Sequence, residues 1–154
     1  MKVFNKPLSE YWQFTKTGIY LLALVSVIRF LMKPVLNIPY AQGTHFTSVT
    51  ILLLVLMVVY AFRANAAGYG YRDLLGIAFT LAMSTAALII LGILIDAFGG
   101  IDTYYTDLEH GGNLNPLLHI GGHLIGGVVS SLVLWGVGSL VYFLANMGQK
   151  KAVA

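Results

Sequence analysis

The chain has 154 residues, of which 58% are hydrophobic and 10% are charged. Because an ordinary soluble domain carries roughly 25% charged residues, this composition predicts an integral membrane protein, and the length predicts one domain over residues 1–154. The formal charge is +3, but the basic residues form no patch interleaved with aromatic residues, so nucleic acid is not an expected partner. The absence of cysteine excludes disulfides, thiolate metal sites and cysteine nucleophiles.

The first membrane-spanning helix is predicted over residues 11–32. Its uncharged core, Thr17–Ile28, is too short for the roughly 30 Å of hydrocarbon in a bilayer. Lys16 at one end and Arg29 with Lys33 at the other extend it, because long basic side chains reach from apolar surroundings to the headgroups. We expect this helix to be retained, since the basic residues follow it directly and no small-x-small cleavage site comes after them.

Two further helices are predicted at residues 45–62 and 73–98. The first of these is almost wholly aliphatic after Thr50. The connection over residues 63–72 is short, which makes the two helices antiparallel neighbours. Asp73 stands at the start of the later helix, where its carboxylate complements the helix dipole.

The fourth helix, predicted over residues 116–146, carries the most informative pattern in the chain. Asn115 is a good N-cap, and Pro116 suits the first helical position, where its missing N–H costs nothing. His119 and His123 are four residues apart, so their imidazoles lie one above the other on one helix face. Small residues beside and below them leave a shallow groove: Gly122, Gly126 and Ser130. Together the four elements predict an all-α, antiparallel four-helix transmembrane bundle.

Orientation follows from the lysines and arginines, which are enriched on the cytoplasmic side of membrane proteins. Seven basic residues fall on the side of the two termini and two on the other: Lys2, Lys6, Lys16, Arg63, Arg72, Lys150 and Lys151 against Arg29 and Lys33. We therefore expect both termini in the cytoplasm and the protein in the bacterial inner (plasma) membrane. All four histidines then fall on the non-cytoplasmic side, beside an acidic loop.

Histidines at one depth in a membrane bundle favour a cofactor site, because ionisable groups there are costly and neutral imidazole is the commonest metal ligand. One form is haem b held between His45 and either His119 or His123, with the small residues of the groove leaving room for the macrocycle. Another is a divalent metal bound by the same three histidines, with further contributions from the acidic loop: His110, Asp102, Asp107 and Glu109. A third interpretation is that the imidazoles only form hydrogen bonds across helices while the glycines allow close packing.

Arg29 and Asp96 are two charged residues predicted just inside the outer interface. At similar depth they can form an ion pair, which places both within the bundle without an isolated charge. In the alternative interpretation Arg29 reaches the headgroups and Asp96 caps the end of the third helix near water.

The chain carries no zincin, Gly-x-Ser-x-Gly, phosphate-loop or dinucleotide-binding motif, so a hydrolase or kinase is not expected. In architecture alone, four helices with histidines near one face resemble the small cytochrome-b-type membrane anchors of respiratory enzymes, and no residue role is transferred from them. The favoured hypothesis is a small non-catalytic subunit that binds haem or a metal within a larger respiratory-type assembly. A purely structural protein that packs against itself or other membrane subunits is the first alternative, and a small transporter or proton-conducting protein is the second.

Overall fold

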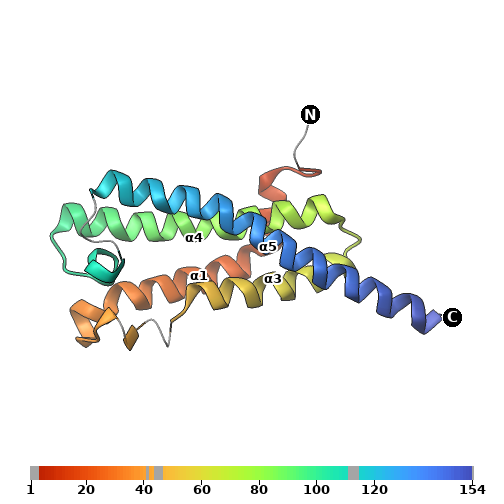
Figure 1. Ribbon diagram of the computed structural model, residues 1–154, viewed down its shortest axis with the longest axis horizontal. Helices are drawn as coiled ribbons and strands as arrows, with labels where there is room; N and C mark the ends of the chain where they lie inside the picture. The colour runs from red at the N-terminus through yellow and green to blue at the C-terminus, as the bar shows by residue number, and fades with distance from the viewer. Residues whose placement is uncertain (1–3, 41, 44–46, 111–114, 154) are drawn as a thin grey trace.

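The computed structural model describes residues 4–40, 42–43, 47–110 and 115–153, and it is all-helical over these ranges. Four long helices form an antiparallel bundle (Figure 1): α1 (Leu8–Leu36), α3 (Val49–Ala66), α4 (Tyr71–Gly99) and α5 (Pro116–Val153). Two short 3-10 turns lie in the loop between α4 and α5: η1 (Tyr104–Thr106) and η2 (Leu108–His110). All four long helices have the length and apolar composition needed to cross a membrane, which confirms the prediction of four such helices.

α1 is longer at both ends than predicted. It begins at Leu8 and continues past Met32, although Pro34 lies in its last turn. A proline at that position removes only one backbone hydrogen bond, so the helix continues through it. α1 ends at Leu36 and is capped by Asn37, which adopts a left-handed conformation with φ 52° and whose N–H donates to the Lys33 carbonyl at 3.1 Å.

Both α3 and α5 begin at a residue whose side chain caps the helix. α3 begins later than predicted, at Val49, because Ser48 caps it: the Ser48 Oγ accepts a hydrogen bond from the Ile51 N–H at 3.3 Å. α5 begins where it was predicted, and the Asn115 Oδ1 accepts a hydrogen bond from the Leu117 N–H at 2.9 Å. α5 then continues past its predicted end, and its last turns project beyond the other helices (Figure 1).

α4 occupies the centre of the bundle. It packs against α1, α3 and α5. Half of the residues in its most apolar 18-residue stretch are buried, compared with 22% in the corresponding stretch of α5. Two glycines let aromatic side chains lie directly on its backbone. A Cβ on Gly76 would lie 2.4 Å from the Tyr11 ring, and a Cβ on Gly92 would lie 2.6 Å from the Tyr105 ring. These two contacts attach the N-terminal segment and the α4–α5 loop to opposite ends of α4.

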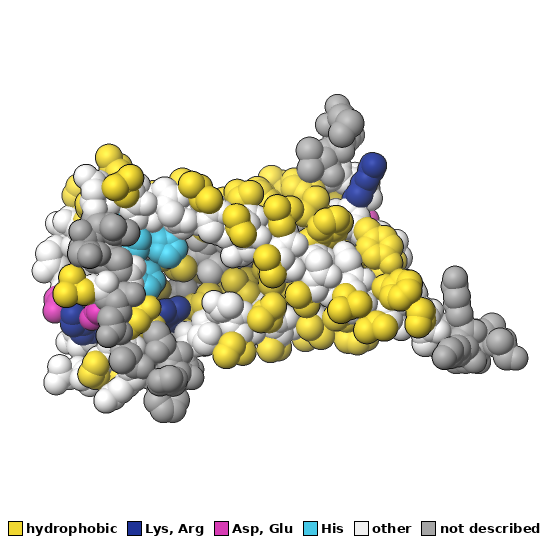
Figure 2. Space-filling model, viewed as in Figure 1, with side chains coloured by type: hydrophobic (Ala, Val, Ile, Leu, Met, Phe, Trp, Pro, Cys, Tyr) yellow, Lys and Arg dark blue, Asp and Glu magenta, His cyan; other side chains and the backbone are white. Residues whose placement is uncertain are grey.

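The outer surface of the bundle is apolar along most of its length. Figure 2 shows large hydrophobic side chains covering the middle of the molecule, while charged side chains gather toward its ends. Many leucines, valines and isoleucines of α1, α3 and α5 are more than 40% exposed. Such a surface is unfavourable in water and suits the hydrocarbon of a bilayer.

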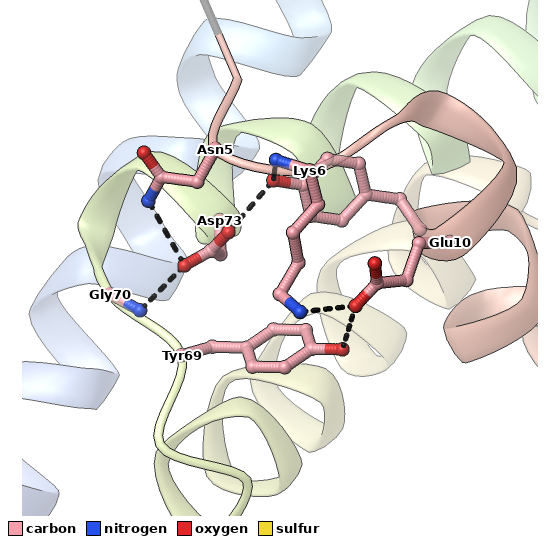
Figure 3. A network of polar contacts seen from close by, with 7 residues as sticks. Asn5, Lys6, Glu10, Tyr69, Gly70 and Asp73 are labelled. Atoms are coloured by element: carbon pink, nitrogen blue, oxygen red, sulfur yellow. Dashed lines mark hydrogen bonds and ion pairs between the residues drawn. The ribbon is translucent and has the colours of Figure 1, made fainter.

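Polar contacts fasten the N-terminal segment at the end of the bundle where α4 begins. The Asp73 carboxylate accepts hydrogen bonds from the Tyr11 Oη at 2.8 Å, the Gly70 N–H at 2.9 Å and the Asn5 Nδ2 at 3.2 Å (Figure 3). Three further side chains form a second polar group beside it: Lys6, Glu10 and Tyr69. Three donors therefore surround a carboxylate whose residue is only 5% exposed.

Candidate metal centre

Three histidines come together at the opposite end of the bundle, where η2 meets the start of α5. His110 ends η2, and His119 and His123 lie on the first turns of α5. One ring nitrogen of each can be chosen so that the three atoms lie within 4.8 Å of one another. Figure 2 shows histidine side chains gathered in one patch near this end. The structure therefore brings His119 and His123 together as predicted and adds His110 to them, while His45, the other predicted member, lies outside the described residues.

His119 and His123 are spaced as two ligands of one ion. Their Nε2 atoms are 3.2 Å apart. Around a tetrahedral zinc ion with Zn–N bonds of about 2.0–2.1 Å, two nitrogens lie about 3.3 Å apart. In the metal-free state the same distance lets one ring donate a hydrogen bond to the other.

A well-anchored loop brings His110 to this pair. The Tyr105 ring is buried and rests on Gly92. Thr103 caps η1 by accepting a hydrogen bond from the Tyr105 N–H at 3.2 Å. The Thr103 N–H and Oγ1 in turn donate to the Asp96 carboxylate at 3.2 and 2.5 Å. These contacts fix the backbone from which His110 projects.

The surroundings of His110 keep its imidazole neutral. Burial, together with the neighbouring rings of His123 and His119, lowers the pKa of His110 from 6.5 to about 4. The His110 ring stacks on the His123 ring, with centroids 5.3 Å and planes 18° apart. The His110 Nδ1 lies 3.3 Å from the Tyr105 carbonyl oxygen. This contact assigns the proton to Nδ1, which leaves the Nε2 lone pair for a metal.

Three tyrosines surround His110 on its other sides. The ring centroids of Tyr40, Tyr104 and Tyr105 lie 5.8, 5.9 and 5.6 Å from that of His110. Burial raises the pKa of Tyr104 to about 12, so its phenol stays protonated and adds no negative charge to the site. Sequence reasoning missed this aromatic wall. The available signal was the pair Tyr104–Tyr105 in an otherwise polar loop, because large rings there usually pack against something.

A cavity of about 390 Å³ opens beside the cluster. His110 and His123 line it, and so do the two predicted groove residues Gly126 and Ser130. The third groove residue, Gly122, faces open space, and a Cβ added there would meet no atom within 4 Å. Apolar side chains also line the cavity, together with polar residues at or in the other three helices: Arg29, Ser48, Thr50 and Thr85.

Arg29 and Asp96 have different partners in the structure. The Arg29 guanidinium lies over the Tyr104 ring, with its Cζ 4.2 Å from the ring centroid. The Asp96 carboxylate accepts the two hydrogen bonds from Thr103 described above. The ion pairs of the described residues do not include one between Arg29 and Asp96.

The predicted acidic ligands lie elsewhere or outside the described residues. The Asp102 and Asp107 carboxylates lie 2.5 and 3.6 Å from the Lys33 Nζ. Within the described part of the chain, the candidate ligand group consists of histidines and includes no carboxylate. The Glu109 side chain and the whole of His45 lie outside the described residues, so the haem arrangement that uses His45 stays a prediction.

Comparisons of the chain with protein-family models, with curated proteins and with solved structures found no match. The interpretation of the site therefore depends on its geometry. Three nitrogen donors from two elements converge beside a cavity whose lining is partly polar and partly apolar. Imidazole donors of this kind suit zinc, copper, nickel and iron ions.

Proposed function

We propose that the protein is a small integral membrane protein that binds one divalent transition-metal ion, of the zinc type, through His110, His119 and His123. The observation that carries the proposal is the convergence of the three ring nitrogens within 4.8 Å of one another. Three imidazoles are the protein ligands of one class of zinc site, in which water or another exchangeable ligand takes the fourth position.

The contacts of the three rings favour a single ion over haem at this cluster. A haem held by two histidines has its macrocycle between the two imidazoles. Here the rings contact one another directly, with centroids 5.0–5.3 Å apart. An ion fits between nitrogens at these distances, whereas a macrocycle between any two of these rings does not.

The fourth position of the proposed site faces the cavity. His110 and His123 both line that cavity, so a molecule in it can reach an ion that they hold. Structural zinc sites are closed by four protein ligands, whereas sites that exchange a ligand keep one position open. We therefore assign the site a role in ligand binding rather than in stapling the fold.

We place the cluster toward the non-cytoplasmic face of a bacterial inner membrane, with both termini in the cytoplasm. In support, Asn5 contacts Asp73, which brings the N-terminal lysines to the same end as the α3–α4 connection. Lys33 contacts Asp102 at the end that carries the histidines. The excess of seven basic residues over two then lies at the end away from the cluster.

We further propose that the protein works beside other membrane subunits or a second copy of itself. Most of α5 is exposed on the bundle surface. Three of its exposed glycines have open space where a side chain would stand: Gly122, Gly126 and Gly136. Small residues of this kind let another helix approach closely in lipid. The size of the purified protein, measured by light scattering with the detergent subtracted, tests this part.

Titration of the detergent-solubilised protein with Co²⁺ tests the metal site. Wild type should bind one ion per chain and develop the visible d–d bands of tetrahedral cobalt, which Zn²⁺ then displaces. Single His110→Gln, His119→Gln and His123→Gln variants should each bind at least about 100-fold more weakly, since each removes one of three ligands.

A matched control for these variants is Leu118→Gln, which introduces the same side chain next to His119 at a position that is 69% exposed. It should bind Co²⁺ as wild type does. Absence of stoichiometric Co²⁺ or Zn²⁺ binding by folded wild type contradicts the proposal and leaves the purely structural role.

A further inference from the structure

Arg29 is a buried cation for which the described residues provide no ion pair. Its residue is 8% exposed, and its side chain lines the cavity beside the histidines. The Arg29 Nε is buried without a hydrogen-bond partner, and so is the hydroxyl of Tyr104, the ring beneath it. A buried donor without an acceptor on a cation is costly in a membrane bundle, so the Arg29 Nε points to a missing acceptor.

The acidic side chains that the structure describes do not supply that group. Asp96 is engaged by Thr103, and both Asp102 and Asp107 contact Lys33. The remaining two lie at the opposite end of the bundle, where they form the polar contacts of Figure 3: Glu10 and Asp73. The guanidinium therefore faces the cavity without a carboxylate from the described residues.

A metal at the histidine cluster would increase the positive charge. Three neutral imidazoles leave the full +2 of a divalent ion uncompensated, and Arg29 adds a further +1 in the same cavity. Interior charges interact strongly because the local dielectric is low. Two positive groups on one cavity are stable together when an anion lies between them.

The wall formed by α3 is also suited to an anion. The N-terminal turn of this 18-residue helix lines the cavity through Ser48, Val49 and Thr50. The first N–H groups of a helix have no partner within it, and the helix dipole places partial positive charge there. Ser130 adds a hydroxyl group from α5, whereas the Thr85 hydroxyl, which also lines the cavity, already donates to the Leu81 carbonyl at 3.0 Å. Three elements, α1, α3 and α5, therefore present donors or positive charge to one cavity of about 390 Å³.

We propose that this cavity binds the oxyanion group, a carboxylate or a phosphate, of a small ligand. One oxygen takes the fourth position on the metal, and the others accept hydrogen bonds from the Arg29 guanidinium, whose fork of N–H donors matches such groups. The contact between the oxyanion and the metal rests on the metal site proposed above. The remaining contacts come from Arg29 and the N-terminus of α3.

The test uses Co²⁺-loaded, full-length protein in nanodiscs of phosphatidylcholine, titrated with acetate or inorganic phosphate at constant ionic strength. At least one of the two anions should shift the cobalt d–d bands in a saturable way, because it enters the coordination sphere. A parallel preparation in nanodiscs containing phosphatidylglycerol distinguishes a lipid headgroup from a free anion. If the headgroup phosphate is the ligand, the shifted spectrum appears there without any added anion.

The variants assign the effect to Arg29. Arg29→Gln should weaken anion binding at least tenfold while Co²⁺ affinity changes less than threefold. Arg29→Lys keeps the charge without the fork, and it should lie between Arg29→Gln and wild type. Arg63→Gln is the matched control, because the Arg63 guanidinium also lies over aromatic rings, those of Phe14 and Tyr60, but away from the cavity.

The outcomes separate the two proposals. A spectral shift that depends on Arg29, with either free anion or with the anionic lipid, supports the oxyanion site. Stoichiometric Co²⁺ binding with no such shift in any preparation overturns the oxyanion site and leaves the metal site intact. Failure of wild type to bind Co²⁺ overturns the metal site, and the bridging oxyanion with it. If Arg29→Gln does not fold, the wild-type titrations and Arg29→Lys still decide.

Discussion

Both ends of the bundle bury charged side chains, and Asp73 at one end and Arg29 at the other differ in how their charge is compensated. At one end, three hydrogen bonds from the chain itself surround the Asp73 carboxylate. At the other, Arg29 lies over an aromatic ring with a buried and unpaired Nε, beside a cavity. A charge satisfied within the chain holds the fold together, whereas one left unsatisfied next to a cavity indicates a site for something outside the chain.

The largest expected effect on stability is at the satisfied end. Asp73→Ala removes the common acceptor of Tyr11, Asn5 and Gly70 and leaves the buried Tyr11 hydroxyl without its acceptor, so the free energy of unfolding should fall by about 3 kcal/mol. Unfolding in detergent measures this. Asp102→Ala, in an exposed ion pair, is the control and should change stability by less than about 1 kcal/mol. Loss of Co²⁺ binding in folded Asp73→Ala would show that the two ends are not independent.

Acid should release the histidine loop without disturbing the Asp73 end. Because the pKa of His110 is about 4 when the loop is docked and 6.5 when it is free, only the free loop takes up a proton as the pH falls from 6.5 toward 4. The loop that carries His110 is therefore held most firmly on the bundle above pH 6.5. By pH 4 the free energy that favours the docked loop has fallen by up to about 3 kcal/mol. Proteolysis of the metal-free protein within residues 100–115, followed against pH, measures this loss.

His119, His123 and Arg29 also lie near His110. His110→Gln is therefore the control that isolates the contribution of this one ring. It should remove most of the dependence on pH between 4 and 6.5. A cleavage profile that is the same in the variant and in wild type would assign the acid response to another group.

Gly92→Ala should disturb the metal site from a distance. The added methyl group would lie 2.6 Å from the Tyr105 ring, so Tyr105 and the loop that carries His110 must shift. Overpacking of this kind costs about 1–3 kcal/mol, and Co²⁺ affinity should fall about tenfold because one ligand is displaced. Gly122→Ala, at a position with no atom within 4 Å, should leave Co²⁺ affinity unchanged.

The smallest expected effect comes from a matched pair of buried tyrosines. Both Tyr11 and Tyr104 are 0% exposed, but only the Tyr11 hydroxyl has hydrogen-bond partners. Tyr11→Phe should lower the free energy of unfolding by about 1–2 kcal/mol, whereas Tyr104→Phe should change it by less than about 0.5 kcal/mol. Equal losses in the two variants, measured in one detergent, would mean that the Tyr104 hydroxyl has a partner after all.

The helices and half of the site could be predicted from the sequence because both depend on local patterns. Long uncharged stretches predict spans, and the spacing of His119 and His123 places both rings on one face regardless of the rest of the fold. The position of His110 depends instead on how Tyr105 packs against Gly92, a contact between loop and helix that no periodicity reports.

The partner of Asp96 is close to it in the sequence and could have been predicted. The surroundings of Arg29 could not be predicted in this way. Thr103 follows Asp96 by seven residues, just beyond the end of α4 at Gly99. Its position in the sequence is therefore compatible with a hydrogen bond to the Asp96 carboxylate. Arg29 and the cavity come from segments far apart in the sequence, and their approach depends on helix packing. Two residues predicted at equal depth in a membrane need not contact each other.

α5 has a consequence for the geometry of any assembly. Its 38 residues give a length of about 57 Å, nearly twice the hydrocarbon thickness of a bilayer, and no proline interrupts it after Pro116. α5 is therefore longer than the hydrocarbon layer is thick, even when the helix is strongly tilted. Because α5 is long, a small rotation of this helix near His119 and His123 would move its other end sideways by a much larger distance.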